Sequence, residues 1–206
     1  GFEFGAQYSF AGDSDKEKNG FARDDHFGNV YARWDGSSVK TALGLEIYSV
    51  GHDSRQAAAP SKTRWSVKWA GAWTPAGSPA TLYAGANFYK NQAGYADITW
   101  DDNALIRYDE SGRGLQAASF YLGGRYQIGS GALLAMVQYL DGTNKGAVRG
   151  DKKDYKRYVG SVGAHYFFSK KLMGYAVASY ADGRGMLADS KASNRFITHV
   201  GLTKWF

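Results

Sequence analysis

The sequence contains no cysteine, which excludes disulfide bonds, thiolate metal sites and thiol nucleophiles for this chain. Proline is scarce as well: Pro60, Pro75 and Pro79 are the only three among 206 residues. No apolar run approaches the ~20 residues of a membrane-spanning helix. These deficits leave open a protein built from strands, since such strands are only half apolar and escape a hydropathy search.

Glycine and aromatic residues are abundant instead, with 27 glycines and 16% Phe, Trp and Tyr. The net charge is +6, but the basic residues are scattered rather than clustered among aromatics, so we expect no nucleic-acid partner. The length fits one domain, 1–206. No secretory signal pattern opens the sequence, so we expect a mature form or a fragment.

Ten segments alternate between apolar and polar residues, which is the period of a β-strand with one face in apolar surroundings. All three prolines fall between these segments, where no ladder N–H is lost. The predicted strands are 2–11, 27–35, 39–50, 62–74, 80–90, 114–128, 131–141, 156–168, 172–181 and 194–206.

The connections between these strands alternate in length. Short turns at 35–38, 74–80, 129–131 and 169–171 alternate with long polar loops at 12–26, 51–61, 91–113, 142–155 and 182–193. Short turns on one side and long loops on the other are typical of a transmembrane antiparallel up-and-down β-barrel of the outer membrane. The sequence therefore predicts an all-β barrel with both termini on the short-turn side.

The apolar face of the strands is also sorted by depth. Aromatic residues lie near both strand ends and aliphatic residues lie between them, as lipid contact requires. A soluble β-sandwich would alternate too, but would have no reason for this sorting. Trp69 falls in the aliphatic belt and does not fit. The two aromatic groups are Trp34, Trp73, Tyr126, Phe168 and Phe206 at the short turns, and Phe10, Trp65, Phe88, Tyr139 and Tyr180 at the long loops.

The opposite face carries many small residues, including Gly5, Gly44, Ser66, Gly85 and Gly123. Side chains fill barrels of about eight strands, whereas 16–18 strands leave an aqueous channel. A closed ten-stranded barrel lined by glycine, alanine and serine would be underfilled. We therefore expect a wider barrel of which these strands are one part.

Two segments carry a resemblance to a known family. Residues 1–10 (GFEFGAQYSF) resemble an internal strand of the general porins of β-proteobacteria, and residues 200–206 (VGLTKWF) are similar to their terminal strand. Thr203 and Lys204 stand where that family usually has Arg and His. The turn 169–172, with Tyr175 and Tyr180, resembles the penultimate turn and strand.

The resemblance implies a water-filled channel in the outer membrane of a Gram-negative bacterium, for passive diffusion of ions and small hydrophilic solutes. It also implies a homotrimer of sixteen-stranded barrels, contact with outer-membrane lipid and lipopolysaccharide, and insertion by the barrel assembly machinery. Val200, Leu202 and Phe206 would form the assembly signal. This chain would supply the last ten strands; a self-contained ten-stranded barrel is the alternative.

Charged residues on the polar face are candidates for ion selectivity, because wall charges set the local potential of a wide pore. Six are basic and one is a clear acid, which favours anions. The alternative is that these charges are paired and have no effect. The candidates are Arg33, Lys40, Arg64, Lys68, Arg125 and Arg157, with Glu46 as the acid.

Enzymatic and adhesive functions are alternatives for a barrel with long loops. His52-Asp53 and Asp101-Asp102 lie in loops, but a protease needs a carboxylate that orients His and a second site that activates water. Ser161 and His165 share a strand face without an evident acid. Asp13, Asp15 and Glu17 lack the other ligands of a calcium loop. We expect no catalytic residue, metal or cofactor.

Overall fold

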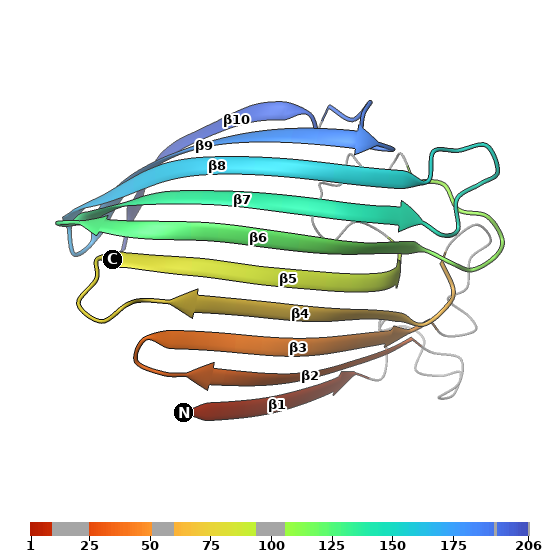
Figure 1. Ribbon diagram of the computed structural model, residues 1–206, viewed down its shortest axis with the longest axis horizontal. Coiled ribbons are helices and arrows are strands. Elements are labelled where there is room, and N and C mark those ends of the chain that lie inside the picture. Colours follow the sequence, from red (N-terminus) through yellow and green to blue (C-terminus); the bar gives the residue numbers. More distant parts are fainter. Residues whose placement is uncertain (10–24, 51–59, 94–105, 192, 206) are drawn as a thin grey trace.

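The computed structural model describes residues 1–9, 25–50, 60–93, 106–191 and 193–205. All ten predicted strands are present within these ranges, and they form one antiparallel sheet (Figure 1). No helix long and apolar enough to cross a membrane occurs in this described part of the chain. The strands are β1 (Phe2–Ser9), β2 (His26–Asp35), β3 (Val39–Ser49), β4 (Arg64–Trp73), β5 (Ala80–Gln92), β6 (Leu115–Ile128), β7 (Gly131–Asn144), β8 (Asp154–Ser169), β9 (Leu172–Gly185) and β10 (Arg195–Lys204).

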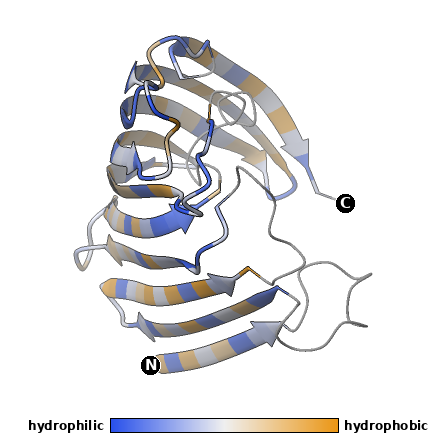
Figure 2. Cartoon of the chain, turned by 90° about the vertical axis from the view of Figure 1, so that its right-hand side faces the viewer, coloured by the Kyte–Doolittle hydropathy of each residue, from blue (hydrophilic) through white to orange (hydrophobic). Residues whose placement is uncertain are grey.

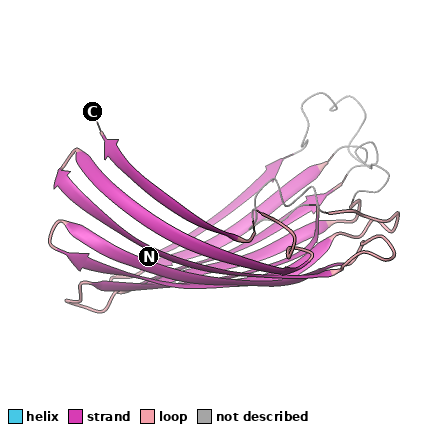
Figure 3. Cartoon of the chain, turned by 90° about the horizontal axis from the view of Figure 1, so that it is seen from above, coloured by secondary structure: helices cyan, strands magenta, loops and turns pink. Residues whose placement is uncertain are grey.

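The strands pair in sequence order, from β1 to β10, so the topology is a simple up-and-down meander. The sheet bends into an open trough, with the short turns at one end (Figure 3). β1 begins and β10 ends at this same end (Figure 1). Within the described residues β1 pairs only with β2 and β10 only with β9, so both edges of the sheet are unpaired. The strands thus form a curved segment of barrel wall.

The two faces of the sheet differ in polarity, as the alternating bands in Figure 2 show. The face that carries Phe4, Leu43 and Phe120 is called the outward face here, and the face that carries Gly5, Lys68 and Ser119 the inward face. Large outward side chains are exposed, with Val200 at 83% and Leu202 at 72%. An apolar surface of this extent would aggregate in water and is stable in lipid.

Trp69, which did not fit the predicted aliphatic belt, has a local explanation. Its indole Nε1 donates a hydrogen bond to Thr41 Oγ1 at 2.9 Å, and Thr41 Oγ1 donates in turn to the carbonyl of Ala70 at 3.1 Å. Thr41 lies nearer the short turns than Trp69 does, because β3 begins at Val39. The polar end of Trp69 is therefore directed toward the short-turn boundary and is satisfied within the protein.

Tyrosine rings occupy part of the space that the small inward residues leave. A Cβ atom added to Gly5 would clash with the Tyr31 ring, and one added to Gly85 would clash with the Tyr121 ring. Tyr155 covers Gly142 and Tyr175 covers Gly201 in the same manner. These rings lie against the wall and occupy the space beside the glycines. The small inward residues therefore do not all leave open space in the interior.

The most buried part of the molecule lies on the inward face near the long-loop end. Tyr89, Leu115, Leu140 and Tyr155 come from four neighbouring strands, and Leu187, from the segment after β9, packs onto them. Tyr155 and Leu187 are fully buried. The hydroxyls of Tyr89 and Tyr155 lie 3.3 Å apart and share a hydrogen bond. A segment beyond the strands thus covers one end of the inward face.

Candidate functional site: the inward face of the sheet

The candidate site is a polar hollow of about 520 Å³ on the inward face at mid-height. Strand alternation places every second side chain of β2 to β7 there. Its polar lining residues are Asn29, Tyr31, Arg33, Glu46, Lys68, Asn87, Ser119, Tyr121 and Gln138. Six of these are neutral hydrogen-bonding groups that were not among the predicted selectivity residues: Asn29, Tyr31, Asn87, Ser119, Tyr121 and Gln138. These residues share an uncharged polar side chain at an inward-facing strand position, and the prediction considered only charged side chains.

Two of the six candidate cations lie beside carboxylates. Arg33 lies 2.5 Å from Asp35 and 4.0 Å from Glu3, and the Tyr31 hydroxyl also donates to Glu3 at 2.8 Å. Glu3 and Asp35 are therefore two further acids on the inward face. Because the carboxylates of Glu3 and Asp35 both lie beside the guanidinium of Arg33, they offset its positive charge locally.

Lys68 and Glu46 form the second pair. Lys68 Nζ lies 2.7 Å from Glu46 Oε2 and donates to Oε1 at 2.8 Å. Ser66 Oγ donates to Glu46 Oε2 at 2.9 Å. Both charged side chains are about a third to a half exposed, so water screens the pair and its own contribution to stability is about 0–1 kcal/mol. The pair fixes opposite charges side by side on β3 and β4.

Three candidate cations, Lys40, Arg64 and Arg125, have no carboxylate partner among the described residues. Arg64 donates to the carbonyl of Pro60 at 3.1 Å, and its guanidinium lies 4.9 Å from the centre of the Tyr48 ring. Arg125 donates to the side-chain amide oxygen of Gln127. These contacts hold the side chains but leave their positive charge uncompensated.

Arg157 is separated from this group. It pairs across the sheet with Leu140 on β7 and Gly183 on β9, beside the buried cluster, and its Nε is buried. The structure therefore distributes the predicted selectivity residues over three regions. Arg33, Glu46 and Lys68 line the mid-height hollow, while Arg64 and Arg157 lie toward the long loops and Lys40 and Arg125 toward the short turns.

Asn87, which lines the hollow, contributes a buried polar atom to its wall. The side-chain carbonyl oxygen of Asn87 is buried and accepts no hydrogen bond within the described residues. A buried acceptor without a partner is costly unless water or a ligand satisfies it. Asn87 lies between Lys68 and Ser119 in the cross-strand pairing. Donor and acceptor groups thus stand side by side on this wall.

Segments that follow the strands narrow the trough at the long-loop end. Asn144 Nδ2 donates to the carbonyl of Arg107 at 3.0 Å, and Tyr108 pairs with Ala147 in an isolated bridge. The Tyr108 hydroxyl donates to the carbonyl of Ala93 at 2.7 Å, and burial raises the pKa of this hydroxyl. Leu187 covers the inward face at the same end, and the apolar Met186-Leu187 pair within a polar loop is a sequence signal that could have indicated its contact with Tyr155.

The terminal strand carries two residues of the predicted assembly signal on the outward face. Val200 pairs with Ala176 and Leu202 with Gly174, and both side chains are exposed. Phe206, the third, lies outside the described residues. The structure thus places Val200 and Leu202 on the outward face, and their role in assembly stays a prediction.

Of the residues considered for other chemistries, only Ser161 and His165 lie in the part of the chain that the structure describes, and they do not contact each other through a hydrogen bond there. His52, Asp53, Asp101, Asp102 and the three acids of the candidate calcium loop lie outside the described residues. Ser161 Oγ shares a hydrogen bond with Ser179 Oγ at 2.8 Å, and the His165 ring packs edge-on against Phe167 at 5.5 Å. No group of three metal-binding side chains occurs in the part of the chain that the structure describes.

Solved structures similar to this chain are outer membrane proteins. No protein-family model matches the chain, and no curated protein does. A loop L8 deletion mutant of OmpT of Vibrio cholerae superposes with a TM-score of 0.63 at 14% identity, over 99% of this chain and 59% of that one. In-vitro folded OmpT gives 0.56 at 13% identity, over 100% and 76%. The trimer form of OmpT gives 0.55 at 13% identity, over 88% and 56%.

The fold is that of an outer-membrane β-barrel. The chain spans 59% of the first of these neighbours, which agrees with the open edges of the sheet. The neighbours are outer membrane proteins of a Gram-negative bacterium, and this supports the predicted location in the outer membrane. At 12–14% identity the likeness concerns the fold.

Proposed function

We propose that this chain forms part of the wall of a water-filled channel, through which ions and small hydrophilic solutes cross the outer membrane by passive diffusion. One observation carries the proposal: a sheet with an exposed apolar outward face turns a polar, charged and hollowed face inward. In a barrel whose outer surface contacts lipid, a polar inner surface is expected when the interior is filled with water. The proposal assigns no catalytic role to any residue and requires no cofactor.

The unpaired edges support a wall of more than these ten strands. Backbone N–H and C=O groups at a sheet edge cannot remain unsatisfied in lipid. β1 and β10 each have one open edge within the described residues. We propose that further strands complete the wall, in a sixteen-stranded barrel that assembles as a homotrimer through the barrel assembly machinery.

The proposed channel prefers anions, but only modestly. Arg33 and Lys68 are paired with carboxylates, while Lys40, Arg64 and Arg125 have no such partner in the described ranges of the chain. Wall charges that lack a local counter-charge set the potential that a passing ion meets. Screening limits each charge to about 8–10 Å at physiological salt. Selectivity should therefore fade as the salt concentration rises.

Planar-bilayer recording tests the proposal on the protein extracted in detergent from outer membranes. A channel gives large ohmic steps, and its reversal potential in a KCl gradient reports the anion preference. Silence of the folded protein would refute conduction. A preference for cations would refute only the charge argument.

A barrel that acts as an adhesin or as a loop-borne protease would give a different result. Such a protein would be silent in the bilayer and would bind a surface or cleave peptides through its loops. For a protease, His52→Ala would abolish cleavage. Conduction that persists in the same variant would separate the two functions.

A further inference from the structure

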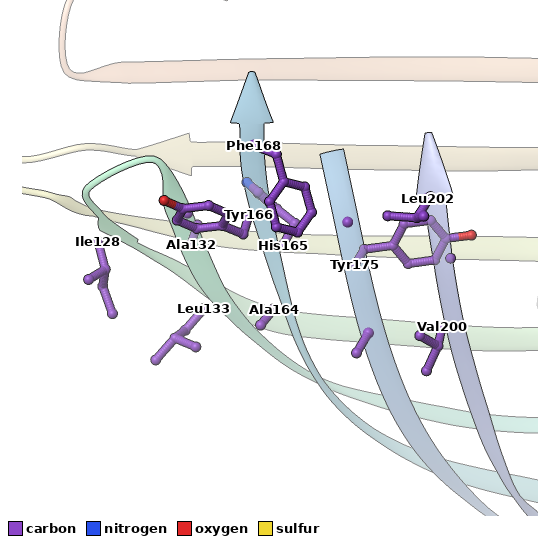
Figure 4. A pocket seen from close by; sticks show the side chains of 14 residues that line it. Ile128, Ala132, Leu133, Ala164, His165, Tyr166, Phe168, Tyr175, Val200 and Leu202 are labelled. Carbon is purple, nitrogen blue, oxygen red and sulfur yellow. The ribbon is translucent and has the colours of Figure 1, made fainter. Parts of the chain in front are cut away.

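An apolar groove of about 820 Å³ crosses the outward face beside the short turns (Figure 4). Its floor is made by the small residues Ala164, Gly174 and Ala176 on β8 and β9. Phe168, Val200 and Leu202 form its sides. The groove is shallow and opens toward the lipid.

The groove is shaped by close packing around Gly174. A Cβ atom added there would lie 2.9 Å from Phe168 Cε2 and 3.4 Å from Leu202 Cδ2. The ring of Tyr166 lies edge-on to that of Phe168, with centroids 5.3 Å apart. Two aromatic rings thus mark the boundary between the apolar groove and the turn.

Lysines stand directly beyond this boundary. Lys170 and Lys171 form the turn between β8 and β9, and Lys204 pairs with Leu172 at the end of β10. The turn is held because Lys171 N donates to Ser169 Oγ at 3.2 Å and the Lys171 carbonyl accepts from Trp205 N at 2.9 Å. All three lysines are exposed. The described residues of 128–136, 162–178 and 198–205 include no Asp or Glu.

We propose that this groove and its lysines bind one anionic phospholipid. The acyl chain lies in the groove, and the phosphate lies among Lys170, Lys171 and Lys204. A phospholipid matches both parts at once, since its apolar chain joins an anionic headgroup at the membrane boundary. A protein surface would have to bring carboxylates and apolar side chains to the same place. The proposal rests on the outer-membrane location and is independent of conduction.

Native mass spectrometry of the folded protein in detergent tests the site. Dioleoyl phosphatidylglycerol is the probe, and dioleoyl phosphatidylcholine is the neutral comparison. Each basic residue near an anionic surface strengthens binding about fivefold. Replacing Lys170, Lys171 and Lys204 together with Gln should therefore remove most bound phosphatidylglycerol. Lys152 and Lys153 are exposed at the opposite end, where Lys152 lies 3.2 Å from Asp189. K152Q/K153Q is the control for the loss of basic charge away from the groove; it is compared with K170Q/K171Q, which removes the same number of charges, and should bind as wild type does.

A second variant tests the groove without changing charge. Ala176→Leu faces lipid and should leave the fold intact, while its larger side chain fills the floor and lowers phosphatidylglycerol binding severalfold. Equal binding of the two lipids, or equal loss in K170Q/K171Q and K152Q/K153Q, would overturn the proposal. It would also be overturned if Ala176→Leu dissociated an oligomer and lipid binding did not change, because a second copy would then occupy the groove.

Discussion

The assignment of the two faces is tested by placing an arginine at adjacent positions of β7. Val137 is outward, 59% exposed and midway along the strand, and it pairs with Leu122 and Gly160. Gln138, the next residue, is inward and lines the polar hollow. The two substitutions therefore have the same chemistry, strand and depth, and differ only in the face that receives the charge.

The expected cost follows from the depth of Val137. At ~3.4 Å per residue and a tilt of ~40°, Val137 lies about 16 Å from one end of β7 and about 18 Å from the other along the membrane normal. This is close to the midplane of a hydrocarbon layer ~30 Å thick. Arginine on the lipid face at the midplane costs about 2–4 kcal/mol. Val137→Arg should thus lower the folding equilibrium constant roughly 30- to 700-fold.

Gln138→Arg should change stability by less than about 1 kcal/mol, because its guanidinium remains in the aqueous trough. Equilibrium unfolding in urea, starting from protein folded into lipid vesicles, measures both values. Val137→Leu is the control for packing and should be close to neutral. Equal costs for the two arginine variants would show that the outward face does not contact lipid.

Four further outcomes are expected. Replacing Arg64, Lys68 and Arg125 together with Gln should move the reversal potential in a KCl gradient toward cations, since Glu46 then keeps its charge without Lys68; an unchanged potential would contradict this. Glu46→Gln alone should shift it toward anions, because it removes the carboxylate 2.7 Å from Lys68. Deleting Phe206 should lower the amount of assembled protein in cells but barely affect refolding in detergent, and equal loss in both would leave Phe206 only a packing role. Hydrogen bonds from the Ser111 side chain and backbone lower the pKa of Asp109. The interaction therefore stabilises the loop at pH values above the usual pKa of Asp, and this stabilisation is lost as the pH falls through the lowered pKa of Asp109. Ser111→Ala should raise the pKa of Asp109 in an NMR titration.

The sequence by itself determined the strands and their faces. Alternation along segments such as 39–50 and 131–141 sufficed, because a strand with lipid on one side must present an apolar residue at every second position. Connection length gave the order of the strands, since short turns join antiparallel neighbours. Predicted and observed strand ends differ most at β7 and β9, which extend further toward the long loops. The residues of these extensions are mostly polar or glycine. They pair with the neighbouring strand, but they show no alternation of apolar and polar residues from which a strand could be predicted.

Only the tertiary structure decided which basic residues of the inward face have a carboxylate beside them. The sequence places Arg33 and Arg125 equally on the inward face, but cross-strand pairing sets Glu3 and Asp35 beside the first and not the second. It also decided that tyrosine rings cover inward glycines and that Leu187 closes over Tyr155. Strand register and the path of the loops bring together residues that are far apart in the chain. The alternation of apolar and polar residues along one strand does not determine which residues of other segments lie beside it.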